Sequence, residues 1–210
     1  MSTDPLTLDE GAMINPLLFP AEINIDNWMF NVVKPFIKGR TLEIDSGNDM
    51  FISCFLNNEL PLHLSNHDPK KCESLYEKYK SNQLIRSVRK INLARESFET
   101  AYADALGKFS TVINLNRLGS QTIDKAKLDN SYLLLQEGGY IIFLMPAYTA
   151  SYSGFEEDAD VIRAGNRTYV RRFMGQSFEV RKTQYLNLPA LPDGSIGHTG
   201  LYVIVIAKRI

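Results

Sequence analysis

The chain has 210 residues, of which 44% are hydrophobic and 22% charged, and its formal net charge is −1 at pH 7. That size and apolar content are sufficient to bury a full β-sheet in one compact domain. The near-zero charge leaves no basic excess for a surface that follows nucleic-acid phosphates, so we expect no nucleic-acid partner.

The first residues lack the basic and apolar regions of a secretory signal, and no apolar run approaches the roughly 18 residues of a membrane span. We therefore expect a cytoplasmic protein with no membrane insertion. The two cysteines, Cys54 and Cys72, fall on the apolar sides of predicted helices and are widely spaced, without other ligands around them. This pattern favours buried thiols over a disulfide framework or a metal site, and we predict no metal.

Residues 1–24 hold several prolines and few periodic apolar positions, which predicts an N-terminal arm or cap ahead of a domain at residues 25–210. The next segment, from Asp26 to Ile37, shows helical spacing of its apolar residues, with Asp26 as the N-cap. Within it we expect Trp28 to anchor the core, because large aromatic side chains dominate core energetics; a substrate contact is the alternative.

A strand that turns sharply into a helix is predicted next. The apolar run Thr41–Ile44 is followed by small and polar residues, after which Phe51, Cys54 and Phe55 recur at helical spacing. A junction of this kind aims free backbone N–H groups at a ligand and lets the chain pass close to it. We interpret the turn as a nucleotide-binding turn.

The second strand is predicted at Leu60–Asn66, and Asp68 with Pro69 forms the N-cap and first residue of the following helix. In dinucleotide-binding folds, an acid at the end of this strand accepts hydrogen bonds from ribose hydroxyls. Here Asn66 takes that place, and its amide can still accept a hydroxyl hydrogen bond but lacks the charge. Asp68 is the alternative acceptor, provided that it leaves its capping role.

Further strands are predicted between Arg86 and Leu93, as an edge strand, and at Phe109–Asn116. A helix over Gln121–Gln136, stopped by two glycines, leads into the almost wholly apolar strand Tyr140–Pro146. Strands that alternate with helices in this way predict a doubly wound, mostly parallel α/β sheet, with ligands at the carboxyl ends of the strands.

The last two strands, Phe178–Leu186 and Leu201–Ala207, have no helix pattern between them, so we expect an antiparallel C-terminal hairpin. The complete prediction is a seven-stranded sheet that is parallel except for Leu201–Ala207, which inserts antiparallel beside Phe178–Leu186. A dinucleotide-binding oxidoreductase would more often end with another parallel unit.

Several phrases of the sequence resemble the class I S-adenosylmethionine-dependent methyltransferases, including one bacterial branch of that family. Glu43, Asp45, Gly47 and Asp49 occupy the four written positions of its motif Glu-x-Gly-x-Gly-x-Gly, with aspartates in place of two glycines. The strand from Phe109 resembles the family's Phe-Asp-x-Val-x-x-x-Asn phrase. Residues 133–143 resemble its phrase of a leucine-rich helix, two glycines and a strand. The resemblance covers roughly residues 25–210.

The resemblance implies a Rossmann-like methyltransferase fold with S-adenosylmethionine as cofactor. It places Glu96 near the adenine amino group, and the alternative for this residue is a solvated acid at a helix N-terminus. Arg117-Leu118-Gly119 replaces the acid and the histidine of a family turn, so no catalytic residue is assigned. The implied cofactor-binding residues are Glu43, Asp45, Gly47, Asn66, Glu96, Ser97 and Asn114.

The segment 147–174 is too long and too polar for a plain connection, and insertions at the ligand edge of a sheet are usually functional. Its phrases resemble those of the bacterial branch, which implies a substrate lid with Tyr148 and Tyr152 as walls and Arg171 or Arg172 bound to an anionic group. The alternative is a surface loop in which the arginines pair with neighbouring acids of the same segment.

The predicted function is a methyltransferase acting on a small molecule or an envelope-related metabolite. We expect weakened cofactor binding, because the Asp45 carboxylate repels the cofactor carboxylate unless it binds the ammonium group. Replacing Asp45 by glycine should then raise affinity. The alternative function is a non-catalytic methyltransferase-like binding or scaffold module, and nicotinamide binding ranks last. The sequence does not set the oligomeric state.

Overall fold

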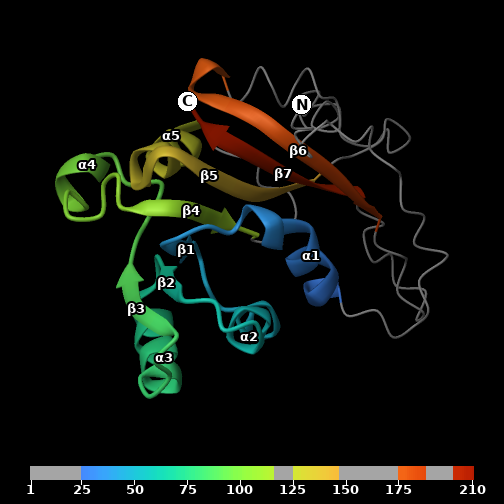
Figure 1. Cartoon of the computed structure of the whole chain (residues 1–210). Helices are drawn as coiled ribbons and strands as arrows, with labels where there is room; N and C mark the ends of the chain where they lie inside the picture. The colour runs from blue at the N-terminus through green and yellow to red at the C-terminus, as the bar shows by residue number, and fades with distance from the viewer. Residues whose placement is uncertain (1–24, 116–124, 147–174, 188–200) are drawn as a thin grey trace, which may run out of the picture.

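The computed structural model describes residues 25–115, 125–146, 175–187 and 201–210, and it contains a seven-stranded sheet with the order β3-β2-β1-β4-β5-β7-β6 (Figure 1). Only β7 runs antiparallel to its neighbours β5 and β6, and the other pairs are parallel. The predicted sheet and C-terminal hairpin are therefore confirmed. The strands are β1 (Thr41–Glu43), β2 (Leu62–Asn66), β3 (Ile85–Lys90), β4 (Phe109–Asn114), β5 (Leu135–Pro146), β6 (Phe178–Asn187) and β7 (Leu201–Arg209).

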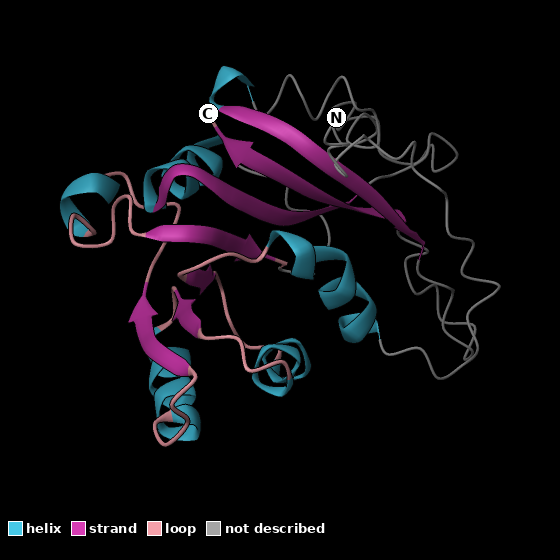
Figure 2. Cartoon of the chain, in the orientation of Figure 1, coloured by secondary structure: helices cyan, strands magenta, loops and turns pink. Residues whose placement is uncertain are grey.

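Helices cover both faces of the sheet, which gives three layers (Figure 2). The side chains of α1, α2 and α3 share one apolar cluster with one face of the strands, and those of α4 and α5 share the other. The helical segments are α1 (Ile25–Val33), η2 (Lys34–Phe36), α2 (Asp49–Asn57), α3 (Pro69–Tyr79), α4 (Phe98–Ala101), α5 (Lys125–Leu134) and η3 (Gly175–Ser177).

The central strands are apolar on both sides because both sides are covered. In β5, Ile141 and Phe143 pack on the α4–α5 side, whereas Ile142 packs on the α1–α3 side. In β7, Val205 and Ile206 divide in the same way. All of these side chains are at most 4% exposed. This alternation explains why β5 is an almost unbroken apolar run in the sequence.

The first helix is rotated relative to its prediction. Met29, Phe30 and Val33 are its most deeply buried side chains, whereas Trp28 is only half-buried. The Phe30 ring packs edge-to-face against two rings of α2, with centroids 6.2 and 5.1 Å away, and this aromatic cluster determines which side of α1 faces inward. The helix already includes Ile25, so Asp26 lies in its first turn rather than at the N-cap.

The end of α5 also differs from its prediction. The helix stops at Leu134, and Leu135 already pairs with β4, so the two following glycines are not the helix stop. Arg209 of β7 ends the helix: its Nη1 donates to the carbonyl oxygens of Tyr132 and Leu135, and its guanidinium lies 3.9 Å from the centroid of the Tyr132 ring.

The glycines instead form an irregular stretch at the start of β5. Gly138 has a φ of +70°, which a residue with a side chain rarely adopts. A Cβ on Gly139 would lie 2.9 Å from the Gln136 carbonyl oxygen and 3.1 Å from that of Ser110. The register of β4 and β5 shifts at this point, so the glycines let the chain bulge and still pack closely.

We predict that Arg209→Met lowers the free energy of unfolding by about 1.5–3 kcal/mol, because the change keeps the apolar stem but leaves two helix-terminal carbonyls without their charged donor. Lys208→Met, one position earlier in β7 and on the opposite face of the strand, is the control and should cost less than about 0.5 kcal/mol. Urea unfolding followed by circular dichroism measures both, and equal losses would contradict the capping role.

Candidate functional site

A cleft of about 450 Å³ opens at the carboxyl ends of β1, β2 and β4. The strand order runs from β1 outward to β3 in one direction and from β4 outward in the other, so the cleft lies where ligands of doubly wound sheets bind. The stretch from Glu43 to Phe51 contributes most of its lining residues. The lining residues are Met29, Glu43, Ile44, Asp45, Ser46, Gly47, Asn48, Phe51, Asn66, His67, Lys71 and Leu115.

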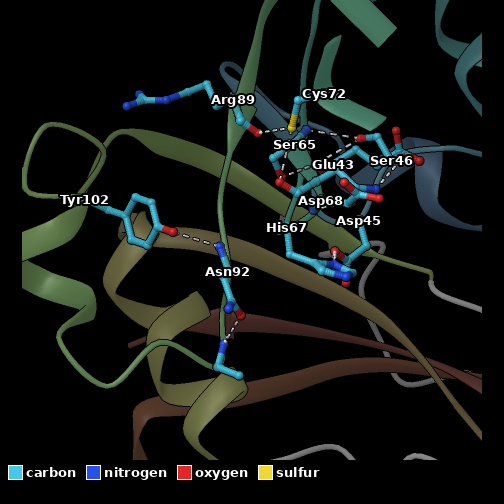
Figure 3. Close-up of polar contacts among 12 residues, drawn as sticks. Glu43, Asp45, Ser46, Ser65, His67, Asp68, Cys72, Arg89, Asn92 and Tyr102 are labelled. Carbon is cyan, nitrogen blue, oxygen red and sulfur yellow. Dashed lines mark hydrogen bonds and ion pairs between the residues drawn. The ribbon is translucent and has the colours of Figure 1, made fainter. Parts of the chain in front are cut away.

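The turn after β1 is hydrogen-bonded to both neighbouring strands, and Figure 3 shows its contacts with Ser65 of β2. On one side, the Ile44 N–H donates to the Ile113 carbonyl oxygen of β4 at 2.8 Å. On the other, the Ser46 N–H donates to the Ser65 carbonyl oxygen of β2 at 2.7 Å, and the Ser65 N–H donates to Ser46 Oγ at 3.2 Å. The hydroxyls of both serines donate to the Glu43 carbonyl oxygen, at 3.1 and 2.9 Å. These bonds hold the cleft wall in one conformation.

The two aspartates that replace motif glycines both have partners. Asp45 has a φ of +54°, a left-handed conformation that Asp tolerates better than most residues, and its Oδ1 lies 2.7 Å from His67 Nδ1. Asp49 begins α2 and binds Lys78 Nζ at 2.6 Å and the Tyr79 hydroxyl at 2.8 Å, both on α3. These two donors hold the pKa of Asp49 below its usual range.

Gly47 keeps the position that the motif reserves for glycine, and its surroundings are open. A Cβ built on Gly47 would meet no atom within 4 Å, so packing within the described chain does not require a glycine there. The residue lines the cleft. Its place in the wall is therefore suited to a ligand that approaches the backbone closely.

At the end of β2, the polar groups of Asn66 are used within the chain. Its Nδ2 donates to the Ser46 carbonyl oxygen at 2.8 Å, and its Oδ1 accepts from the Asp68 N–H at 2.9 Å. Asp68 Oδ1 in turn accepts from the Lys70 N–H at 2.9 Å, which confirms the predicted N-cap of α3. Between them, the His67 side chain is 57% exposed and lines the cleft.

Glu43 is the most unusual charged group of the site. Its residue is only 5% exposed, and its Oε2 has no hydrogen-bond partner among the described residues. Burial raises the pKa of Glu43 to about 8. A hydrogen bond from Ser46 lowers this pKa by a smaller amount, and the negative charge of Asp49 raises it further. At pH 7 this carboxyl group is therefore mostly protonated, and its residue lines the cleft.

The other sequence-predicted residues lie at different distances from the cleft. Asn114 ends β4, directly before the cleft-lining Leu115, and is half-buried. Glu96 and Ser97 are exposed, precede α4 and are not among the lining residues. The predicted lid residues Tyr148, Tyr152, Arg171 and Arg172 lie outside the described residues, as does the predicted arm at residues 1–24.

Outside the predicted turn and the helix after it, sequence reasoning did not assign Met29, His67, Lys71 or Leu115 to the cleft. Met29 comes from α1, which is tied to the turn because Asn48 Nδ2 donates to Asp26 Oδ1 at 2.8 Å. Lys71 comes from the first turn of α3, and His67 was assigned only to the entry of that helix. The signal that could have placed both is their position directly after the predicted strand that ends at Asn66, because ligands bind at the carboxyl ends of such strands.

Within the described ranges, no group of three histidine, cysteine or acidic side chains is arranged to hold a metal ion. Both cysteines are free thiols, Cys54 buried and Cys72 half-buried. None of the helices that the structure describes is both long and apolar enough to cross a membrane.

The strand order and the antiparallel β7 define the fold of the class I methyltransferases, and solved structures of that fold match the chain. One is a CurJ carbon methyltransferase, with 15% identity and a TM-score of 0.59; the match covers 88% of this chain but 54% of that one. No protein-family model matches the chain, and no curated protein matches it by sequence.

Two further matches span more of the partner structure. The geranyl diphosphate C-methyltransferase from Streptomyces coelicolor A3(2), solved with Mg²⁺, geranyl diphosphate and S-adenosyl-L-homocysteine, has 11% identity and a TM-score of 0.59, over 88% of this chain and 77% of that one. The N-methyltransferase NodS from Bradyrhizobium japonicum WM9 has 12% identity and a TM-score of 0.58, over 88% and 94%. These likenesses establish the fold of the chain.

The raised pKa of Glu43 predicts that stability falls with rising pH. Above about pH 4.5 the unfolded chain loses the Glu43 proton, whereas the folded chain keeps it. The free energy of unfolding is therefore unaffected by this group below that pH and decreases as pH rises to about 8. The loss is at most about 1.4 kcal/mol per pH unit within that window.

The variant Glu43→Gln should remove this pH dependence, because glutamine resembles the protonated carboxyl group. Its stability advantage over the natural chain should grow from pH 5 to pH 8, as measured by urea unfolding at each pH. Glu77→Gln, which changes an exposed carboxylate on α3, is the control and should leave the pH profile unchanged. Parallel profiles for Glu43→Gln and the natural chain would show that Glu43 is charged in the folded state.

Proposed function

We propose that this protein is an S-adenosylmethionine-dependent methyltransferase that acts on a small molecule. The observation that carries the proposal is the cleft at the carboxyl ends of β1 and β4, with the buried and unpartnered Glu43 Oε2 in its wall. The fold supports it, and so do the neighbouring structures, one of which contains S-adenosyl-L-homocysteine together with geranyl diphosphate.

The residues of the cleft fit such a cofactor. Glu43 would accept hydrogen bonds from its ammonium group, because a buried carboxyl oxygen without a donor needs one. Gly47 would let it lie against the backbone, and Asn66 and Asn114 would contact it from the ends of β2 and β4. In our proposal Glu96 and Ser97 reach the adenine from the loop after β3.

When bound, the cofactor supplies an electrophilic methyl group, and the protein mainly has to hold the acceptor in line with it. The segment 147–174 would form the acceptor side, with Tyr148 and Tyr152 as apolar walls and Arg171 or Arg172 binding an anionic group. We therefore propose a small acceptor with an acidic or phosphate-bearing part.

The first test is titration of the protein with S-adenosylhomocysteine by calorimetry at pH 7, in two buffers that differ in ionisation enthalpy. We expect binding with release of close to one proton, because the ligand ammonium replaces the proton on Glu43. Glu43→Gln should bind more weakly and release none. Binding without proton release would remove Glu43 from the ammonium site, and no binding at millimolar ligand would contradict the proposed function.

We further propose that Asp45 weakens cofactor binding through its charge. Asp45→Asn is the sharpest test, because asparagine also tolerates the left-handed backbone and still offers an acceptor to His67. Affinity for S-adenosylhomocysteine should rise about fivefold, which corresponds to the removal of roughly 1 kcal/mol of charge repulsion. Asp104→Asn, an exposed change far along the sequence on the α4 side, is the control. A lower affinity of Asp45→Asn would contradict the charge repulsion and would show that the carboxylate supports binding, either directly or through His67.

A non-catalytic module is the second candidate, and a specific observation favours it. Both aspartates in the motif have taken up intramolecular contacts, Asp45 with His67 and Asp49 with α3, and the amide of Asn66 is bonded on both of its polar atoms. A cleft remodelled in this way can serve as a binding or scaffold surface. Absence of any thermal shift with S-adenosylhomocysteine would select this candidate.

A further inference from the structure

His67 presents a polar group to the cleft that no sequence motif assigns. The residue follows β2 directly, its side chain is 57% exposed, and it is part of the cleft wall. Its Nδ1 lies 2.7 Å from Asp45 Oδ1, so the imidazole ring is held by a residue of the turn after β1 (Figure 3). This pair of side chains thus joins the turn after β1 to the segment after β2 at the carboxyl edge of the sheet.

The hydrogen-bond chemistry of this pair determines what the ring can offer a ligand. A carboxylate only accepts hydrogen bonds, so Nδ1 must carry the proton that lies between the two side chains. In the neutral ring, Nε2 is then an acceptor with a free lone pair. The carboxylate fixes the tautomer and the orientation of the imidazole, as it does for histidines at metal and catalytic sites.

The neighbouring polar groups at the end of β2 make contacts within the chain. Asn66 Oδ1 binds the Asp68 N–H, and Asp68 caps α3. Ser46 Oγ accepts from the Ser65 N–H, and its hydroxyl donates to the Glu43 carbonyl oxygen. Lys71 can only donate. His67 lines the cleft, and its Nε2 has no hydrogen-bond partner among the described residues, so it can accept from a ligand hydroxyl.

We propose that His67, held by Asp45, accepts the hydrogen bond of a ribose hydroxyl of the bound nucleoside, and so replaces the acid that this strand end carries in other nucleotide-binding sheets. This inference rests on the proposed function, because it requires a ligand with a ribose in the cleft. His67 is a binding residue in this scheme, and Asp45 is a positioning residue that acts through it.

The experiment compares S-adenosylhomocysteine with its 2′,3′-dideoxy analogue, which lacks the ribose hydroxyls, by calorimetry on the full chain. His67→Phe keeps a flat ring and removes the acceptor, and His67→Gln keeps an acceptor near the position of Nε2. We expect His67→Phe to weaken binding of S-adenosylhomocysteine about tenfold, and His67→Gln to stay within about threefold of the natural chain. Neither variant should change the affinity for the dideoxy analogue.

Lys71→Met is the matched control, because Lys71 lines the same edge of the cleft but offers no acceptor. Its effect should be equal for the two ligands. Thermal unfolding checks that each variant is folded, which is expected for an exposed side chain.

The outcomes separate the inference from the function. If the natural chain binds S-adenosylhomocysteine and His67→Phe binds it within twofold, or loses both ligands equally, His67 does not receive the ribose hydroxyl and the inference is wrong while the function stands. If the natural chain binds neither ligand at millimolar concentration, the proposed function fails and the inference fails with it.

Discussion

The cleft depends on one set of hydrogen bonds, those that join the turn after β1 to β4 on one side and to β2 on the other. Backbone groups of Ile44 and Ser46 bond to Ile113 and Ser65, and the two serine hydroxyls converge on the Glu43 carbonyl oxygen. Because those bonds use main-chain and small polar groups inside the sheet, they leave the side chains of Glu43 and Asp45 to form the wall. A wall of this kind does not need a fully glycine-rich loop to keep its shape.

The aspartates show how such a loop tolerates the loss of glycine. Asp45 takes the left-handed backbone conformation that glycine adopts most easily, and its carboxylate gains a partner in His67. Asp49 lies at the N-terminus of α2, where the helix dipole favours a negative charge, and it joins α2 to α3 through Lys78 and Tyr79. Each aspartate therefore makes a side-chain contact that a glycine could not make, and each adds a carboxylate to the turn or to the helix after it.

Sequence reasoning was reliable where a signal is local. The apolar runs predicted the strands and the reversed β7, and the Asp68-Pro69 pair predicted the start of α3, because both patterns act through neighbouring residues. It was wrong at the end of α5, since the cap comes from Arg209, which is 74 residues from Leu135 in the sequence. It passed over His67 for the same reason: the partner that gives this residue its orientation, Asp45, lies 22 positions away in the turn after β1.

The bond between Asp26 and Asn48 connects the first helix to the cleft, and Met29 of that helix contributes to the cleft wall. Local undocking of α1 would open this wall. A ligand that binds only when α1 is docked therefore makes undocking less favourable, by the free energy of its binding. Occupancy of the cleft and protection of the α1 amides from hydrogen exchange are therefore two measures of one equilibrium. Hydrogen exchange in α1 would therefore measure ligand binding in the cleft. Conversely, a change that undocks α1 lowers the affinity of the cleft for that ligand by the same factor by which the ligand disfavours undocking.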